Sequence, residues 1–214
     1  MAKRRRKKKK IKAPLVLFII LVILLIIGGL VYIYRDAITE KTKNISPNAF
    51  TYPTKYEEYV LKYSKEYDID PRFIFAVINT ESHFDPDATS DVGARGLMQI
   101  MEEAYDWIKF RLDDQRDHTY DDMYDPELNI QYGTYMLKYL YDKFDNSYEL
   151  AAAAYHGGMN AVDQWIAEGT VDPDNFSLDD VPSDVTANYI YKVMTAYNKY
   201  KEKLEEDIYN GQEN

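Results

Sequence analysis

The sequence predicts a mainly α-helical domain behind a single N-terminal transmembrane helix. Three observations lead to this fold class. An uncharged run over residues 13–34 directly follows a strongly basic segment. Further along the chain, apolar residues recur at the three- and four-residue spacing of amphipathic helices. Alternating strand patterns are scarce, and the connecting segments are rich in Asp, Pro and Gly.

The first two elements are the basic segment, residues 1–12, and the membrane anchor, residues 13–34. At about 1.5 Å per residue the anchor makes a helix of about 33 Å, which is enough to cross a bilayer core. Because Lys and Arg stay on the cytoplasmic side, the chain is expected to be a single-pass protein of the cell membrane with its carboxyl-terminal part extracytoplasmic. The alternative is a cleaved signal peptide, whose apolar core is shorter and ends in small residues. This run ends in Tyr-Ile-Tyr-Arg, which favours a retained signal-anchor.

Charge and composition exclude several function classes. Residues 13–214 hold 17 Lys and Arg against 36 Asp and Glu, a formal charge of −19. A part this acidic repels phosphates, so we expect no nucleic-acid partner. The absence of cysteine excludes a disulfide scaffold, a cysteine nucleophile and a thiolate metal site.

The rest of the chain is interpreted as a stalk over residues 35–52, a domain over residues 53–207 and a disordered tail over residues 208–214. Thr54 to Glu57 matches a capping box that would open a helix through Tyr67. Asp70 and Pro71 supply an N-cap and a first-turn proline for the next helix. Three further segments carry helical apolar spacing: Leu128 to Phe144, Tyr148 to Tyr155 and Asn188 to Glu206.

Glu81 occupies an apolar position of the second helix. Counting three and four residues onward from Ile74 gives Val77, Ile78 and Glu81. Desolvation and the negative end of the helix dipole would both raise the pKa of this carboxyl. A raised pKa keeps it protonated near neutral pH, as a general acid requires. Position alone leaves open that Glu81 simply emerges into water.

The segment after Glu81, residues 82–101, is a loop followed by a new apolar stretch. Pro86, Gly93 and Gly96 punctuate the loop. Gln99 is the polar exception among its apolar neighbours, an arrangement that can hold an amide near a carboxyl in a mostly dry cleft. Met98 could equally fill the core.

Four ordered blocks of the sequence resemble the lytic transglycosylases with a lysozyme-like SLT domain. Residues 81–101 resemble the family's ES-x-F-x-P-x-A-x-S-x-x-GA-x-GLMQIM signature. Residues 125–140 resemble its DP-x-x-NI-x-x-G-x-x-YL-x-x-L segment, residues 153–162 its A-x-AYNAG-x-x-AV segment, and residues 189–193 its YV-x-KV helix. The blocks together cover nearly the whole domain.

The resemblance implies a lysozyme-like helical fold and cleavage of the glycan strands of peptidoglycan. The family's catalytic glutamate corresponds to Glu81. It would protonate the oxygen between N-acetylmuramic acid and N-acetylglucosamine and then accept the proton of the muramic C6 hydroxyl, which closes a 1,6-anhydro ring. Because the nucleophile belongs to the substrate, one carboxylate suffices where other glycosidases use two.

The resemblance also implies a set of substrate-binding residues: Ser90, Met98, Gln99, Tyr155, His156 and Tyr189. For all of them except His156, structural packing remains an alternative. Tyr155 corresponds to the tyrosine whose hydroxyl lies near the catalytic carboxyl. His156 stands where the family usually has Asn, and its charge would add pH dependence near neutrality. Val185 and Ala187 also depart from the family pattern, which affects fine substrate contacts rather than the reaction class.

No cofactor or metal is expected. Asp85 and Asp87 are the nearest candidates for a second carboxylate and are interpreted as loop-capping or solvated residues. The acidic cluster over residues 113–125 lacks EF-hand spacing, and His118 within it is predicted at the surface.

Two alternative functions remain beside the transglycosylase. One is a goose-type-lysozyme-like hydrolytic muramidase, and the other is a non-catalytic wall-binding or scaffolding module. The expected partners are peptidoglycan strands and the membrane, with cell-wall or secretion machinery as a further candidate.

Overall fold

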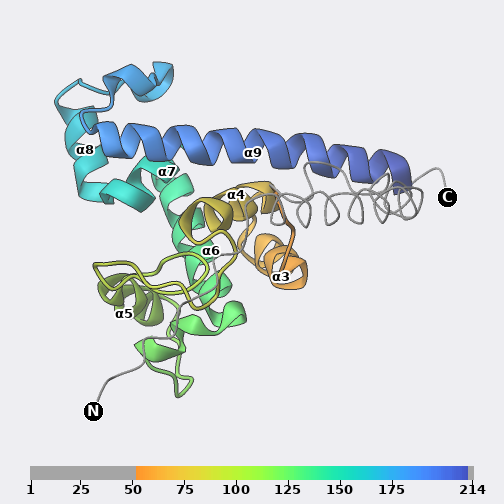
Figure 1. The fold of residues 1–214 in the computed structure, drawn as a ribbon. Coiled ribbons are helices and arrows are strands. Elements are labelled where there is room, and N and C mark those ends of the chain that lie inside the picture. Colours follow the sequence, from red (N-terminus) through yellow and green to blue (C-terminus); the bar gives the residue numbers. More distant parts are fainter. Residues whose placement is uncertain (1–51, 212–214) are drawn as a thin grey trace, which may run out of the picture. The chain divides into compact units, whose positions relative to one another are not determined.

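The structure of the protein, a computed structural model, describes residues 52–211 (Figure 1). The chain divides into two units, Met1–Ala49 and Phe50–Asn214, and the described residues all belong to the second. The predicted basic segment, the membrane anchor and all but the last residue of the stalk therefore lie outside the described residues. Between residues 52 and 211, no helix is both long enough and apolar enough to span a bilayer.

The described part of the chain is helical, which confirms the predicted mainly α class. It contains two isolated β-bridges, which pair Arg95 with Thr89 and with Ile100, and no strand. Its α-helices are α3 (Glu57–Tyr67), α4 (Pro71–Glu81), α5 (Glu102–Arg111), α6 (Pro126–Lys143), α7 (Tyr148–Gly157), α8 (Met159–Ala167) and α9 (Asp184–Gly211). Three 3₁₀ helices connect them: η1 (Tyr120–Tyr124), η2 (Pro173–Asn175) and η3 (Leu178–Asp180).

The predicted start of α3 is wrong, and that of α4 is confirmed. α3 begins only at Glu57, after Tyr56 in the left-handed region at φ 60°, and no side chain caps it. Thr54 lies too far upstream to cap this helix. At α4 the side chain of Asp70 accepts a hydrogen bond from the backbone N–H of Arg72, and Pro71 occupies the first turn. The proline has no N–H to leave unpaired there.

Two helices were not predicted, and the last one is longer than expected. α5 and α8 are short, and the α5 sequence places charged residues among its aromatic ones. α9 begins four residues before the predicted Asn188 and continues to Gly211, so residues 208–211, expected in the tail, are helical.

α4 lies at the centre of the core and fixes the place of Glu81. Residues 73–78 of this helix are all buried. α9 packs along α4 and α7, and α3 packs against α4 and α6 (Figure 1). Enclosure on several sides explains why α4 is apolar around most of its circumference. It also means that the last residue of α4 projects from a rigid element, between α9 and the loop that follows.

Candidate active site

Glu81 is the last residue of α4 and is partly buried. Its Oε1 accepts a hydrogen bond of 2.6 Å from the Tyr189 hydroxyl on α9. Burial raises the pKa of Glu81 to about 7, while the Tyr189 hydrogen bond acts in the opposite direction. A carboxyl with this pKa is present both as acid and as base near neutral pH, so it can give a proton and take one back.

Tyr189 is held in place by His156. The two rings stack with centroids 4.6 Å apart and an interplanar angle of 26°. The Nδ1 of His156 lies 3.2 Å from Oγ1 of the buried Thr186, a residue that the sequence did not single out. Burial lowers the pKa of His156. The ring therefore stays neutral near pH 7, and the expected pH dependence at neutrality moves to lower pH.

Tyr155 lies near Glu81 without bonding to it. Its hydroxyl donates to the backbone oxygen of Met98 at 2.8 Å. Burial, and then the charge of Glu81, raise the pKa of Tyr155 well above its ordinary value. The Glu81 partner is thus Tyr189, whereas the resemblance pointed to Tyr155 for this place.

The loop between α4 and α5 is braced by its own polar side chains. Gln99, at φ 49°, donates its amide to the backbone oxygens of Gly96 at 2.9 Å and Ala88 at 3.1 Å. Ser90 accepts a 3.0 Å hydrogen bond at Oγ from the backbone N–H of Ala94. Both predicted sugar-binding side chains therefore shape the loop beside the end of α4, and a sugar-binding role for them stays a prediction.

Met98 is fully buried, and the element behind it is α6. A Cβ on Gly133 of α6 would lie 2.3 Å from the Met98 sulfur, so only glycine lets this side chain pack there. Met98 contributes its backbone oxygen to Tyr155, while its thioether faces the core. Its predicted substrate contact remains untested.

Asn129, on α6, holds the loop between α4 and α5 in place. It is fully buried and makes three hydrogen bonds. Its Oδ1 accepts from the backbone N–H of Met98 at 2.8 Å, and its Nδ2 donates to the backbone oxygens of Met123 at 2.7 Å and Arg95 at 3.0 Å. An Asn inside an apolar helical stretch is a visible signal in the sequence, but it does not show that the partners lie in the loop and in η1.

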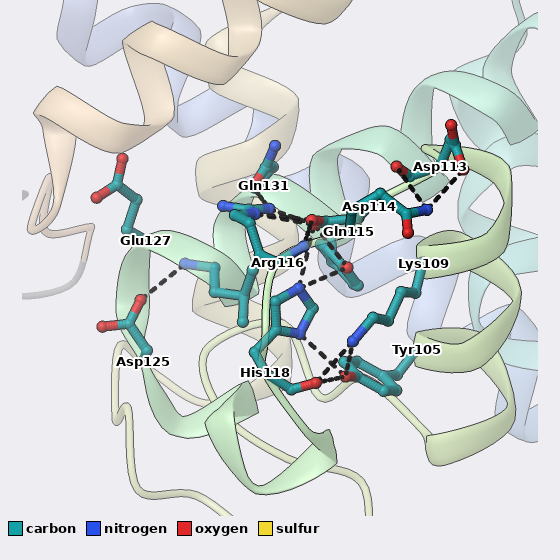
Figure 2. A network of polar contacts seen from close by, with 12 residues as sticks. Tyr105, Lys109, Asp113, Asp114, Gln115, Arg116, His118, Asp125, Glu127 and Gln131 are labelled. Carbon is teal, nitrogen blue, oxygen red and sulfur yellow. Dashed lines mark hydrogen bonds and ion pairs between the residues drawn. The ribbon is translucent and has the colours of Figure 1, made fainter.

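η1 contacts the loop, and a second polar network lies in the segment before η1. The Tyr120 hydroxyl donates to the backbone oxygens of Gly93 and Ile100. Upstream of η1, Asp114 accepts hydrogen bonds from Arg116 and from His118 (Figure 2). It also accepts one from the Tyr132 hydroxyl at 3.0 Å.

These charge-assisted contacts, above all those of Arg116, hold the pKa of Asp114 well below its usual range. The surface position predicted for His118 is wrong. Its side chain is only 9% exposed, because its ring packs edge-on against Tyr105 and Tyr132.

Other acidic residues near Glu81 face water. Asp85 and Asp87 are exposed, and Oδ1 of Asp85 accepts the backbone N–H of Asp87 at 3.0 Å, as in a capped turn. Within the described part of the chain, no group of three or more His, Asp or Glu is arranged to hold a metal ion.

Comparisons with known proteins agree on one family. The family described as the transglycosylase SLT domain matches residues 58–175. A soluble lytic murein transglycosylase from Salmonella typhimurium is 34% identical over 70% of this chain and 23% of its own length. A membrane-bound lytic murein transglycosylase C from Klebsiella pneumoniae is 30% identical over 76% of this chain and 51% of its own length.

A solved structure shows the same fold. The chain resembles the 70 kDa soluble lytic transglycosylase of Escherichia coli with a TM-score of 0.67 and 28% identity, over 72% of this chain and 25% of that one. This chain therefore spans about a quarter of the length of its soluble relatives.

Proposed function

The chain belongs to the transglycosylase SLT domain family, and we propose from this premise that it is a lytic transglycosylase of peptidoglycan. It would cleave the β-1,4 bond between N-acetylmuramic acid and N-acetylglucosamine without water, leaving a 1,6-anhydromuramic end. The observation that carries the proposal is a partly buried carboxyl at the end of a rigid helix, with a pKa near 7 and one tyrosine donor.

Glu81 would act first as general acid and then as general base. In its protonated form it gives its proton to the glycosidic oxygen as the C1–O bond breaks. The carboxylate so formed accepts the proton of the muramic C6 hydroxyl, whose oxygen attacks C1 and closes the ring. The proton that Glu81 gave stays on the new hydroxyl of the leaving sugar, and the C6 proton replaces it, so Glu81 ends in its starting protonation state. Intramolecular attack has a large effective molarity, so no second carboxylate is needed to activate a nucleophile.

Tyr189 would stabilise the carboxylate between these two steps. Its hydroxyl donates to Oε1, and a hydrogen bond strengthens when its acceptor becomes charged. Since the charge on Glu81 exists only after the first proton transfer, this contact favours the state in which the glycosidic bond is breaking. We assign Tyr155 a positioning role, through its hydrogen bond to the Met98 oxygen.

We also propose that the enzyme is anchored in the cell membrane by residues 13–34 and acts on the wall outside. The basic segment and uncharged run support this orientation. The match to a membrane-bound relative is consistent with an anchored enzyme. The match to soluble relatives concerns the domain and is consistent with its lying outside the membrane.

Mass analysis of digested glycan strands tests the reaction. The expected products end in anhydromuramic acid and are lighter by one water than the products of hydrolysis. Reducing muramic ends instead would establish the goose-type-lysozyme-like muramidase. Strands that bind but stay intact would establish a wall-binding module.

Glu81→Gln tests the site. This variant should lose cleavage and still bind strands, because the amide keeps the shape but cannot deliver the proton. Asp85→Asn is the matched control, since Asp85 is a nearby carboxyl that faces water, and it should cleave as the wild type does. Full activity in Glu81→Gln would refute the assignment.

A further inference from the structure

A surface pocket of about 1120 Å³ lies at the opposite end of α4 from Glu81. Its lining comes from the length of α3, the start of α4, the end of α6, the start of α7 and Leu204 of α9. Residues 70–72 at the start of α4 line it, and Glu81 closes the same helix. At about 1.5 Å per residue, the length of α4 puts about 15 Å between the two places. The pocket is therefore separate from the proposed reaction site.

One wall of the pocket is a stacked pair of tyrosines. The rings of Tyr141 and Tyr148 lie 4.6 Å apart at 26°. Tyr148 is fixed from behind by Phe73 at 4.7 Å and by Tyr197 at 5.1 Å. Because the core already holds these two rings in place, little conformational entropy is lost when a ligand binds to them. Each ring offers an apolar face and a polar hydroxyl for contact.

The rest of the lining carries charges of both signs. The cations are Lys65, Arg72 and Lys138, and the acids are Glu57, Asp68 and Asp70. The charges of this lining therefore balance, on a domain that is acidic as a whole.

The charged groups differ in whether they already have partners. Arg72 is bound to Asp70, and Lys138 pairs with Asp142 at 2.7 Å. Glu57, Lys65 and Asp68 form no ion pair or side-chain hydrogen bond with another residue that the structure describes. Unpaired charges of both signs around a concave surface favour a ligand that also carries both signs.

We propose that this pocket binds the peptide stem of peptidoglycan while the glycan strand is cleaved at Glu81. The inference rests on the proposed function. Of the two parts of that substrate, the sugar strand offers mainly hydroxyl and acetamido groups, whereas the peptide branches carry carboxylates and an amine. Lys65, which has no partner, would receive one carboxylate, and Lys138 would exchange Asp142 for another. Asp68 and Glu57 would receive the amine, and the tyrosine wall the aliphatic chain. A second hold on the same polymer raises the effective concentration of strands at the reaction site.

Binding of soluble fragments tests this directly. The probes are the free tetrapeptide stem released from the host's peptidoglycan by an amidase, and a peptide-free N-acetylglucosamine dimer. Calorimetric titration uses the full-length Glu81→Gln chain in mild detergent, so that nothing is cleaved. Adding Lys65→Ala and Lys138→Ala should weaken binding of the tetrapeptide about tenfold or more, because two charge-assisted contacts are lost.

The matched control pair is Lys192→Ala and Lys143→Ala. Lys192 is an exposed lysine on α9, and Lys143 is paired with Asp163 as Lys138 is with Asp142. Neither lines the pocket, so this pair should leave the affinity unchanged. Thermal melting of all variants shows whether they fold.

Three results would overturn the inference: no saturable binding of the tetrapeptide, equal loss in both lysine pairs, or the sugar dimer showing the same dependence on Lys65 and Lys138. In an otherwise wild-type chain, the Lys65/Lys138 variant should still cleave short peptide-free strands. Loss of all cleavage in the wild type would instead overturn the proposed function and leave the peptide site standing.

Discussion

At the scale of single residues, the carboxyl could be located from the sequence and its partner could not. The apolar spacing of α4 places Glu81 on the buried side, and burial is the main cause of its raised pKa. The donor to that carboxyl is Tyr189, 108 residues further along the chain. No local pattern distinguishes it from Tyr155, because the choice depends on how α7 and α9 pack against the end of α4.

Tyr189→Phe should shift the pH dependence of cleavage. The Tyr189 hydroxyl favours the charged form of Glu81, so its loss raises the pKa of Glu81 above about 7. The general acid is active when protonated, and the fall in rate at high pH therefore moves to higher pH. Because a hydrogen bond to a charged group contributes about 1.5–3 kcal/mol, kcat should fall about 10- to 100-fold.

A pH–rate profile of the purified enzyme measures both effects. Tyr191→Phe is the control, since Tyr191 is 59% exposed on the same helix. If Tyr189→Phe leaves the profile in place, the tyrosine contributes only its ring.

Glu81→Gln should stabilise the fold at alkaline pH. The folded protein holds the Glu81 proton up to a pKa of about 7, against an ordinary pKa of 4.5 for an exposed glutamate. The stability from this proton is fully present below pH 4.5 and is lost as the pH rises through 7. At pH 8 the variant should exceed the wild type by up to about 3 kcal/mol in free energy of unfolding.

Urea unfolding at pH 4 and pH 8 checks this prediction. The two proteins should be close at pH 4 and differ at pH 8. A difference of the same size at both values would show that the change comes from packing rather than from the proton.

At the scale of elements, helices with sequence caps were predictable and the loop geometry was not. Asp70 and Pro71 mark the start of α4 because each satisfies a constraint of the first turn. α5 and α8 were not predicted because their apolar faces are short. The hydrogen bonds that Asn129 makes with Met98 and Arg95 of the loop depend on tertiary packing, which residue spacing does not reveal.

Asn129→Ala should loosen the loop and lower activity together. Three backbone groups would lose a buried partner, and an unsatisfied buried group costs about 1–3 kcal/mol. We expect the free energy of unfolding to fall by about 3 kcal/mol and kcat to fall as well, since the Met98 oxygen that receives Tyr155 would shift.

Thermal or urea unfolding, paired with a cleavage assay, measures this. Asn160→Ala, an exposed position on α8, is the control and should change neither quantity. Lower stability with unchanged kcat would mean that the loop keeps its shape without Asn129.

At the scale of the whole molecule, the fold class and family followed from the four sequence blocks, because these blocks lie on the elements that meet near Glu81. The polar network around Asp114 could not be predicted from the sequence. Its members come from α5, the loop after it and α6. A run of aspartates in the sequence predicts a solvated loop, and only the folded chain brings His118, Tyr105 and Tyr132 together near Asp114.

Removing residues 1–34 should release the protein from membranes. The uncharged run is the only stretch in the sequence long and apolar enough to span a bilayer. Fractionation of cells should find the full chain in the membrane pellet and the shortened chain in the soluble fraction, with cleavage of isolated strands unchanged. A shortened chain that stays in the pellet would refute the anchor.

The continuity of α9 links the reaction site to the place where the chain enters the domain. Tyr189 bonds to Glu81, and Tyr200 on the same helix donates its hydroxyl to the backbone oxygen of Pro53 at 2.8 Å. They are eleven positions apart, which is about 17 Å of unbroken helix. If the anchor holds Pro53 at a fixed distance from the membrane, α9 therefore also fixes the distance from the membrane at which Glu81 can cleave a glycosidic bond.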